Sequence, residues 1–304
     1  QGTGTQQVSA LTVTQSASTV FSGAVNISNG MTLSATAGDV SFLNGVTTGA
    51  ASTLATTGTL QIGDATADTS SIAAGLSRGV GLQTVLAGGI TVAGAVSLSG
   101  AAIPAGQVAT INSGSNPVTF NTTVSGPGGL TVNSGGVTTF VGQVGAATPL
   151  SGITTDAAGT TVISGGQMRT SGAAGQTYND PVSIGAGPAN TVFLSGGNDV
   201  TFNQTLTGNG GDITFGSMPA PLGNLQVVGA LTNVDDFDVF AASASVNSGS
   251  NNAINRVAFN TSGNVSHFDQ GGILLDTSSV GGTLVLSADT GSITQTGLVS
   301  VGGA

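Results

Sequence analysis

The chain has 304 residues, of which 38% are hydrophobic and only 5% are charged, and its formal net charge at pH 7 is −10. Three Arg stand against 13 acidic residues, so the chain has no basic stripe for phosphate groups, which excludes a nucleic-acid-binding protein. Its mean hydropathy of +0.33 excludes a disordered chain, because disorder combines low hydrophobicity with high charge. No apolar run approaches the roughly 18 residues of a transmembrane helix, so no membrane-spanning segment is predicted.

The charged residues are unusual in kind as well as in number. The sequence contains no Lys and no Glu, and every acidic residue is Asp. Long charged side chains normally solvate helix surfaces, so their absence argues against helices. Asp favours turns, because its short carboxylate bonds nearby backbone N–H groups. The surface is therefore expected to consist of Ser, Thr, Asn, Gln and Gly. The absence of Cys decides little about the redox compartment.

Residues 1–39 begin with a polar stretch and then alternate apolar and polar residues in LTVTQ, TVFSGAVNIS and GMTLSA. This period of two predicts short strands. The C-terminal stretch TLVLSADTGSITQTGLVSVGGA is equally strand-like, and neither end carries an evident cap of the kind that isolated solenoids use. We therefore expect either that neighbouring repeats belong to a longer chain or that the end strands pair with another copy.

Residues 40–117 contain VSFLNGV, a weak first copy of a repeat that becomes clearer downstream. Gly-, Ala- and Thr-rich stretches follow it. The stretch SSIAAGLSRGVGLQ allows one helical turn, and its glycines disfavour a longer helix.

Residues 118–216 carry the strongest internal repeat. The piece VTFNTTVSG at 118–126 returns 82 residues later as VTFNQTLTG at 200–208. A shorter period near twenty residues lies inside this one, and strand–turn pieces at that period are typical of a β-solenoid. Its expected inward, stacked positions are Phe42, Phe120, Phe140, Val162, Val182 and Phe202.

Residues 217–304 first depart from the repeat and then return to it. Pro219 and Pro221 predict a boundary or a protruding loop near 217–224. The coil pattern resumes from 254 to the end. We expect one elongated β-solenoid over residues 1–304.

Several stretches resemble repeats of a known protein family. They are GGLTVNSGGVTTFVGQVGAATPLSGITTDAAGTTVISGG, QTYNDPVSIGAG and the terminal GSITQTGLVSVGG. These resemble repeats of large bacterial surface exoproteins, the filamentous-haemagglutinin-like and autotransporter-like adhesins. The resemblance covers residues 118–216 well and 254–304 moderately. It implies a right-handed parallel β-helix, export from the cell, and a place outside the bacterium or on its outer surface.

The sequence NVDDFDVF holds the one acidic cluster, formed by Asp235, Asp236 and Asp238. Clustered carboxylates can act as general acid and base, as in β-helical polysaccharide hydrolases, or bind calcium. Alternation along a strand would place Asp236 and Asp238 on one side and Phe237 with Asp235 on the other. We weigh solvated turn or strand positions as the simpler interpretation, because substrate-orienting Arg and Tyr residues are scarce.

Two further patterns suggest nucleophilic catalysis. His267 is the single histidine, and two residues along a strand from Asp269 it would share a face with it. An outward polar pair is the simpler interpretation. The stretch GLSRG at 75–79 matches G-x-S-x-G and would make Ser77 a nucleophile, but that motif requires a strand-to-helix elbow that nothing in the sequence predicts.

Two turn-like stretches complete the candidates. The stretch GNGGDITFG at 208–216 faintly resembles a calcium-binding nonapeptide, but its spacing departs from that motif and we interpret it as a turn. In QTYNDPV, Tyr178 is expected to be half-buried, while Asn179, Asp180 and Pro181 turn the chain.

We expect a structural or adhesive β-helical rod that is no enzyme and needs no cofactor or metal. Its expected partners are neighbouring repeats or copies joined end to end, glycans, and cell-surface proteins. A filament subunit and a polysaccharide-degrading enzyme that uses the Asp cluster are the alternatives.

Overall fold

The computed structural model describes residues 4–14, 16–34, 37–79, 82–187, 189–247 and 254–303. These residues form 38 strands and no helix. Apart from one isolated antiparallel bridge in the loop at 217–220, the described pairings are parallel, and partners in neighbouring coils lie about 21 residues apart. The chain divides into two compact units, Gln1–Leu150 and Ser151–Ala304. Each unit is a parallel β-solenoid.

Unit 1 stacks its strands on three faces. The first face contains β1 (Gln6–Val8), β4 (Val25–Ile27), β7 (Val46–Thr48), β10 (Thr69–Ile72), β13 (Gly88–Val92), β16 (Val108–Gly114) and β19 (Gly129–Ser134). The second contains β2 (Leu11–Val13), β5 (Met31–Leu33) and β8 (Thr53–Leu54), then β11 (Leu76–Ser77), β14 (Val96–Leu98), β17 (Val118–Phe120) and β20 (Val137–Phe140). The third contains β3 (Ser16–Phe21), β6 (Ala37–Phe42), β9 (Leu60–Ile62), β12 (Gln83–Leu86), β15 (Gly100–Ala102) and β18 (Val124–Ser125).

Unit 2 has less regular coils, whose length changes along the unit. Its strands up to residue 232 are β21 (Leu150–Thr155), β22 (Thr160–Ile163), β23 (Gln167–Tyr178), β24 (Val182–Ile184), β25 (Asn190–Leu194), β26 (Val200–Phe202), β27 (Leu206–Thr207), β28 (Asp212–Phe215), β29 (Leu222–Val227) and β30 (Leu231–Thr232). The remaining strands are β31 (Val234–Asn247), β32 (Ile254–Thr261), β33 (Val265–Asp269), β34 (Ile273–Leu275), β35 (Ser278–Val280), β36 (Leu284–Ala288), β37 (Ile293–Gln295) and β38 (Val299–Val301).

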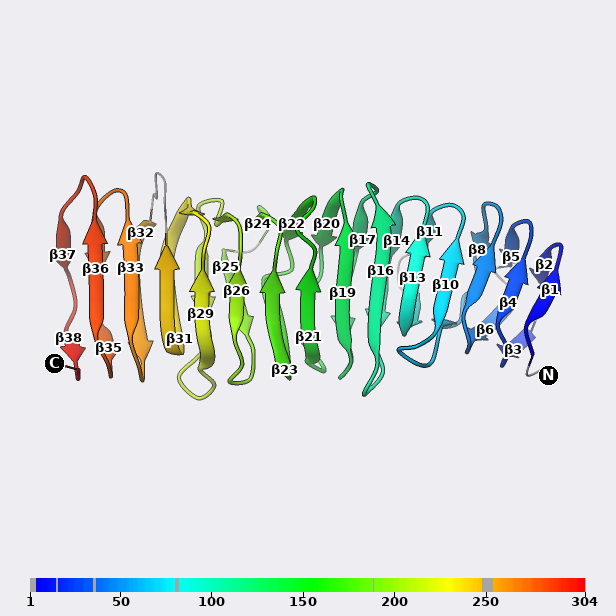
Figure 1. The fold of residues 1–304 in the computed structure, drawn as a ribbon, viewed down its shortest axis with the longest axis horizontal. Coiled ribbons are helices and arrows are strands. Elements are labelled where there is room, and N and C mark those ends of the chain that lie inside the picture. The colour runs from blue at the N-terminus through cyan, green and yellow to red at the C-terminus, as the bar shows by residue number, and fades with distance from the viewer. Residues whose placement is uncertain are drawn as a thin grey trace. The chain divides into compact units, whose positions relative to one another are not determined.

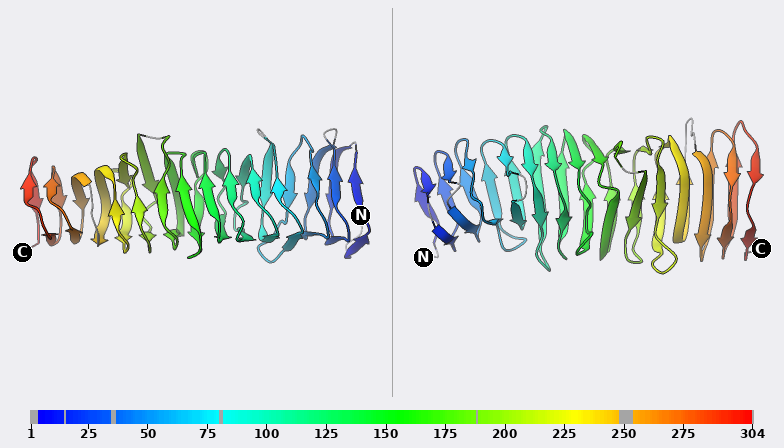
Figure 2. Two further views of the ribbon diagram at one scale, coloured as in Figure 1. Left: turned by 90° about the horizontal axis from the view of Figure 1, so that it is seen from above. Right: turned by 180° about the vertical axis from the view of Figure 1, so that it is seen from behind.

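The coils wind in the same sense within each unit. In Figure 1 the chain rises along the near strands, passes behind at the top and returns to the front one step closer to the C-terminus. This path is right-handed, as expected, and the two further views in Figure 2 show the same succession of parallel strands. Each coil thus lays its strands beside those of the previous coil.

Inward aromatic side chains stack from coil to coil in unit 1. Phe120 and Phe140 are register partners with parallel rings 5.2 Å apart, and both are fully buried. Phe42 is also fully buried and lies in register between Phe21 and Ile62. In a parallel ladder, register partners point to the same side of the sheet in every coil, so identical side chains lie directly above one another.

The predicted inward positions in unit 2 need one correction. Val182 and Phe202 are buried, as expected. Val162 is only half-buried and pairs with Ser183, because Thr161 and Ile163 take the inward positions of β22. The inward positions in this coil are therefore Thr161 and Ile163, the two residues next to Val162.

The recurring piece has the same local form at each of its three positions. The copies at 118–126 and 200–208 each form a buried strand, a corner at Asn121 or Asn203, and a second short strand. VSFLNGV likewise ends β6, turns at Asn44 and begins β7. The helical turn allowed within 70–83 is absent, since its described residues form β10, β11 and the start of β12.

Unit 1 encloses one cation. The Arg78 side chain is buried, and its guanidinium donates to the carbonyl oxygens of Leu54, Thr56 and Gly58 at 2.7–3.2 Å. Burial lowers the pKa of Arg78. This side chain satisfies backbone carbonyls at a corner, where the ladder leaves them without N–H partners.

Candidate functional site

The outer face of unit 2 carries uncharged polar side chains in register. Gln226, Ser245, Ser266 and Val285 follow one another in β29, β31, β33 and β36. Strand alternation turns them outward, because Leu225, Ala244 and Val265 take the neighbouring inward positions. The result is a row of amide and hydroxyl groups, ending at an apolar side chain, at intervals of about 4.8 Å.

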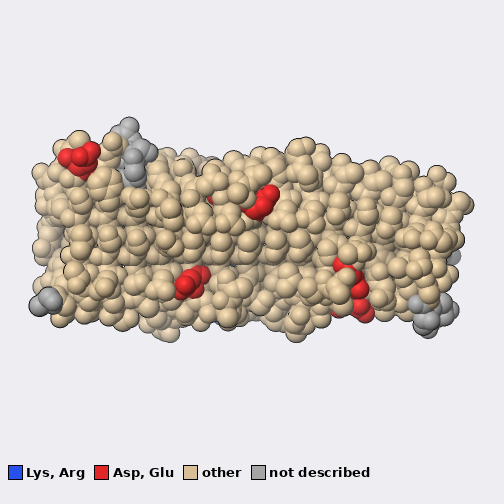
Figure 3. Space-filling view, in the orientation of Figure 1, with Lys and Arg blue, Asp and Glu red and all other residues tan. Residues whose placement is uncertain are grey.

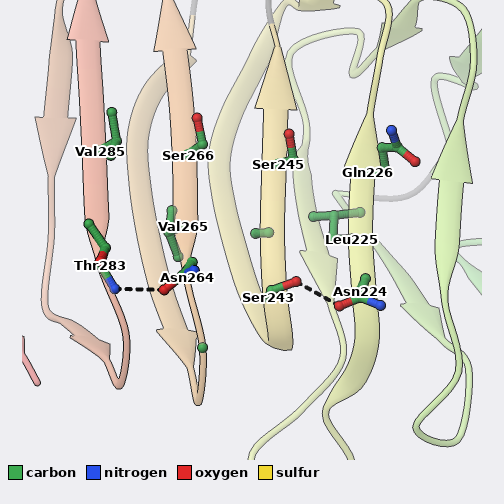
Figure 4. Close-up of a pocket in the computed structure, with 12 residues that line it drawn as sticks. Asn224, Leu225, Gln226, Ser243, Ser245, Asn264, Val265, Ser266, Thr283 and Val285 are labelled. Atoms are coloured by element: carbon green, nitrogen blue, oxygen red, sulfur yellow. Dashed lines mark hydrogen bonds between the residues drawn. The ribbon is translucent and has the colours of Figure 1, made fainter. Parts of the chain in front are cut away.

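A shallow groove of about 800 Å³ lies over these strands. Its wall residues come from β29, β31, β33, β36 and the turns before them (Figure 4): Asn224, Gln226, Ser243, Ser245, Asn264, Ser266, Thr283 and Val285. Small serines on the middle coils leave room between the larger side chains of Gln226 and Val285. The groove therefore forms because small side chains lie between two larger ones along the ladder.

Hydrogen bonds fix one edge of the groove. The Ser243 hydroxyl donates to Asn224 Oδ1 at 2.6 Å, and the Asn224 amide donates to Asp199 Oδ1 at 3.1 Å. The Thr283 backbone N–H donates to Asn264 Oδ1 at 2.9 Å. These bonds orient the two asparagine side chains, and within the described ranges no hydrogen bond occupies the Asn264 side-chain N–H groups.

The groove lining contains no charged side chain. In Figure 3, acidic residues form a few isolated patches on an otherwise uncharged face. Binding in the groove depends on hydrogen bonds and shape, because no charged side chain lines it.

The predicted acidic cluster lies on β31 and is organised by Arg256 of β32. Asp236 and Asp238 share the outward side, as predicted, and Phe237 is buried between them. Asp235 departs from the expectation, since it is exposed and accepts a hydrogen bond from the Asn255 amide at 2.6 Å. Two residues, Asp235 and Asp236, separate the inward Val234 from the inward Phe237 within β31, so strict alternation does not hold there.

Arg256 links carboxylates on two neighbouring coils. Its Nε donates to Asp236 Oδ1 at 2.9 Å, its Nη2 pairs with Asp236 Oδ2, and its Nη1 pairs with Asp276 Oδ2 at 2.6 Å. The pKa of Arg256 is raised, first by the hydrogen bond to Asp236. The pKa of Asp276 is lowered, first by the Thr277 backbone N–H and then by Arg256. Asp236 is thus held as one partner of a bidentate ion pair.

Asp238 is the carboxyl with acid character in this cluster. Partial burial raises its pKa, and Arg256 lowers it by a smaller amount. A raised pKa is what a general acid requires. The neighbouring Asp236 is occupied by Arg256, whereas the Asp212 carboxylate of β28 acts on Asp238 and further raises its pKa.

His267 and Asp269 lie inside the solenoid, which corrects the expectation of an outward pair. Both point inward from β33 and are about 1% exposed. Neither imidazole nitrogen has a hydrogen-bond partner within the described ranges, and Asp269 accepts from the Gly271 N–H at 2.7 Å. Burial lowers the pKa of His267 to about 4 and raises that of Asp269. The two residues share a face, as predicted, but the structure shows no hydrogen bond between them.

The other sequence candidates are parts of the scaffold. Ser77 is exposed on β11 beside Ser97, in a parallel ladder without a strand-to-helix elbow. Residues 208–211 form the predicted turn, with Asn209 at a φ of 56°, and β28 follows. Among the residues that the structure describes, no group of three His, Cys, Asp or Glu is placed to hold a metal ion.

Tyr178 and Asp180 lie deeper than predicted. Tyr178 is fully buried rather than half-buried, and its hydroxyl donates to Gln176 Oε1 at 3.1 Å. The buried Asp180 carboxylate accepts from the hydroxyls of Thr155 and Thr161 at 2.5 and 2.7 Å. Burial raises the pKa of both Tyr178 and Asp180. The contacts of Asp180 tie its corner to the corner between β21 and β22 in the preceding coil and serve the fold.

No family model matches the chain, and no curated protein and no solved structure shows significant similarity to it. The described part of the chain contains no helix with the length and apolar character needed to cross a membrane.

Sequence reasoning missed the groove, because its residues come from four strands spaced over about sixty positions. Serine and asparagine are common throughout the chain, so no residue type marks those that line a depression. To predict the groove from the sequence, one would need to know which residues pair between coils. That pairing depends on the number of residues in each corner.

Proposed function

We propose that this protein is a structural and adhesive β-solenoid, secreted from a bacterium or displayed on its surface, that binds glycans or surface proteins through its outer polar faces. The observation that carries the proposal is the uncharged groove of unit 2, where amide and hydroxyl groups repeat in register. Such groups match the hydroxyl groups of neutral polymers.

The scaffold supports this function physically. Backbone ladders hold each coil on its neighbour, and stacked aromatic rings fill the core beneath the outer faces. Side chains on such a ladder are held in fixed positions, so little ordering entropy is lost when a partner binds. The resemblance of residues 118–216 to repeats of large surface adhesins points to the same role.

The proposed role does not require catalysis. Asp236 is paired bidentately with Arg256, and His267 is enclosed in the core without a hydrogen-bond partner among the described residues. The repeats would act through stiffness and contact area.

The test is binding of the purified protein to a panel of immobilised neutral glycans and to intact bacterial and epithelial cells. We expect saturable retention that changes less than twofold between about 0.05 and 0.5 M salt, because the groove has no charged side chain to screen. Retention that vanishes at high salt, or no retention on any surface, would overturn the proposal. Sedimentation of the same sample separates discrete particles from filaments that grow end to end.

A further inference from the structure

A second depression of about 290 Å³ lies beside the groove, at a corner of unit 2. It is bounded by the loop 217–221 between β28 and β29, by the middle of β31, by the end of β32 and by β35 (Figure 1 locates β31 and β32). We call it the corner pocket, lined by Ser217, Met218, Pro221, Phe240, Ala241, Asn260, Thr261, Ser262 and Ser279. Its volume lies near the lower end of the roughly 300–1,000 Å³ typical of small-molecule pockets.

One wall of the corner pocket is apolar. Phe240 is half-buried and points outward, because its neighbours Val239 and Ala241 take the inward positions. Met218, 76% exposed, and Pro221 complete this wall from the loop. Most phenyl rings of this chain are fully buried, whereas Phe240, like Phe21 and Phe268, is only partly buried.

The loop that carries Met218 has a defined shape. Ser217 and Ala220 exchange two backbone hydrogen bonds, at 3.1 and 3.0 Å. Gly216 begins the loop with a φ of 72°, and a Cβ there would lie 2.2 Å from the Phe240 carbonyl oxygen. Only glycine allows this close approach, which brings the loop against β31.

The side chains that follow Phe240 on the neighbouring strands are polar and uncharged. Asn260 is the register partner of Phe240, and Ser279 is the register partner of Asn260. Within the described ranges, no hydrogen bond occupies the Asn260 side-chain amide or the Ser279 hydroxyl, whereas the Thr261 hydroxyl donates to the Gly263 carbonyl oxygen at 3.2 Å. An amide and a hydroxyl are therefore free to bond a ligand that rests on the Phe240 ring.

We propose that the corner pocket binds one pyranose ring of a neutral glycan, with the C–H face of the sugar on Phe240 and Met218 and its hydroxyl groups on Asn260 and Ser279. A sugar ring has an apolar face and a polar rim, and the pocket offers apolar and polar side chains next to one another. The lining carries no charge, which disfavours acidic sugars, phosphates and cations. This inference rests on the proposed adhesive function and names its ligand.

The neighbouring groove extends the site. β31 passes from the corner pocket at Phe240 into the groove at Ser243 and Ser245, and the chain after β32 does the same from Ser262 to Asn264. The two depressions thus follow one another along the same segments. A glycan chain anchored by one ring in the pocket would continue over the polar row of the groove.

The test measures binding of soluble hexasaccharides from β-glucan, mannan and galactan by calorimetry and by saturation-transfer NMR. Phe240→Ala is expected to weaken binding of the hexasaccharide that the native protein recognises by at least tenfold, and Asn260→Ala by a smaller factor. Phe240→Trp, which keeps an aromatic face, should retain binding. Val141→Ala removes an exposed apolar side chain of unit 1 and should change nothing. Thermal unfolding of each variant shows that the coil is intact.

The outcomes separate the two proposals. If the native protein binds a hexasaccharide and both Phe240→Ala and Asn260→Ala bind it equally well, the corner pocket is not the site, while the adhesive function stands. If the native protein adheres to cells but binds no neutral hexasaccharide, or binds an apolar peptide in the pocket instead, the ligand assignment is wrong and adhesion stands. If it adheres to no cell and no glycan, both proposals fail.

Discussion

Two parts of unit 2 hold their coils together in different ways. From 176 to 239, register partners lie mostly 24 or 25 residues apart, as in Val182 with Leu206 and Val200 with Leu225. From 254 to the end of the described residues they lie 18 to 21 apart, as in Val257 with Leu275 and Ser278 with Val299. We call these parts the aromatic coils and the C-terminal coils.

The longer circumference of the aromatic coils is filled by rings. Tyr178 stacks on Phe202 at 4.8 Å, Phe193 stacks on Phe215 at 4.9 Å, and Phe193 meets Phe202 edge-on at 5.3 Å. Parallel stacks run from coil to coil, and edge contacts run across the core. Such pairs add to the free energy gained from burial alone.

The C-terminal coils enclose a narrower core with polar side chains in it. Phe259 meets the imidazole of His267 instead of another phenyl ring, at 5.7 Å, and Asp269 is buried nearby on the same strand. A buried nitrogen without a partner weakens the folded state. We infer that coil length sets the room for aromatic stacking, and that the C-terminal coils are the less stable part of unit 2.

The largest expected effect comes from breaking the aromatic stack. Phe202→Ala removes the ring that stacks on Tyr178 and meets Phe193 and Phe215 edge-on. It should lower the free energy of unfolding by about 3–5 kcal/mol, since the surrounding rings cannot close the cavity. Urea denaturation followed by circular dichroism measures this loss. Val228→Ala, at an exposed position, serves as the control. A loss for Phe202→Ala no larger than that of the control would refute the stack as the main stabilising element.

Acid should weaken the C-terminal coils through His267. Its pKa is about 4 when folded and near 6.5 when unfolded, so the unfolded chain binds a proton first as the pH falls. The stability contributed by the neutral ring is present above about pH 6.5 and is lost towards pH 4, by on the order of 3 kcal/mol. Buried Asp269, with a raised pKa, opposes this change at the acid end, because its protonation favours the folded state.

Replacing the one histidine tests this assignment. His267→Leu keeps an apolar side chain in the core and should flatten the decline in stability between pH 7 and 5, measured by urea denaturation at several pH values. The histidine explanation is excluded if the variant declines as steeply as the native protein. The carboxyl groups remain in both proteins, so their contribution cancels in the comparison.

A smaller effect is expected at the corner where the aromatic coils begin. Asp180→Ala removes the shared acceptor of the buried Thr155 and Thr161 hydroxyls and should lower the free energy of unfolding by about 1–3 kcal/mol. Asp180→Asn keeps one carbonyl acceptor and should cost less. The exposed Asp289→Ala serves as the control in the same denaturation series. Equal stability of Asp180→Ala and native protein would show that these bonds add nothing.

The smallest expected effect belongs to the acidic cluster. Asp236→Asn breaks the bidentate pair with Arg256, whose side chain is 40% exposed, and should lower the free energy of unfolding by less than about 1 kcal/mol. We expect no change in the molecular mass of any polysaccharide incubated with either protein. Cleavage by the native protein that disappears in Asp236→Asn would establish the hydrolase alternative.

The sequence was sufficient to predict the solenoid, the stacked Phe120 and Phe140, and the side shared by Asp236 and Asp238. The prediction assumed a nearly constant number of residues per coil, whereas the corners differ in length. Val162 was therefore predicted to point inward, but its neighbours Thr161 and Ile163 do so instead. Alternation placed His267 and Asp269 on one side of a strand, but their polarity suggested the outer side. Their inward direction is set by Val265, which begins the same strand in the core.

The corner pocket could not be predicted from the sequence. Met218, Phe240, Asn260 and Ser279 lie up to about sixty residues apart, and only the register brings them together. The prolines at 219 and 221 did indicate a loop, and the structure places that loop against β31. The number of residues in each coil, which sets the register between strands, could not be read from the sequence.

Amide hydrogen exchange measured by mass spectrometry tests most directly whether the aromatic stack makes one part of unit 2 more stable than the other. We expect the strands of the C-terminal coils, β33 to β37, to exchange first, and the difference from β26 to β29 to widen when the native protein is moved from pH 7 to pH 5, after correction for intrinsic exchange rates. Uniform protection along unit 2, or earlier opening of β26 to β29, would contradict this account.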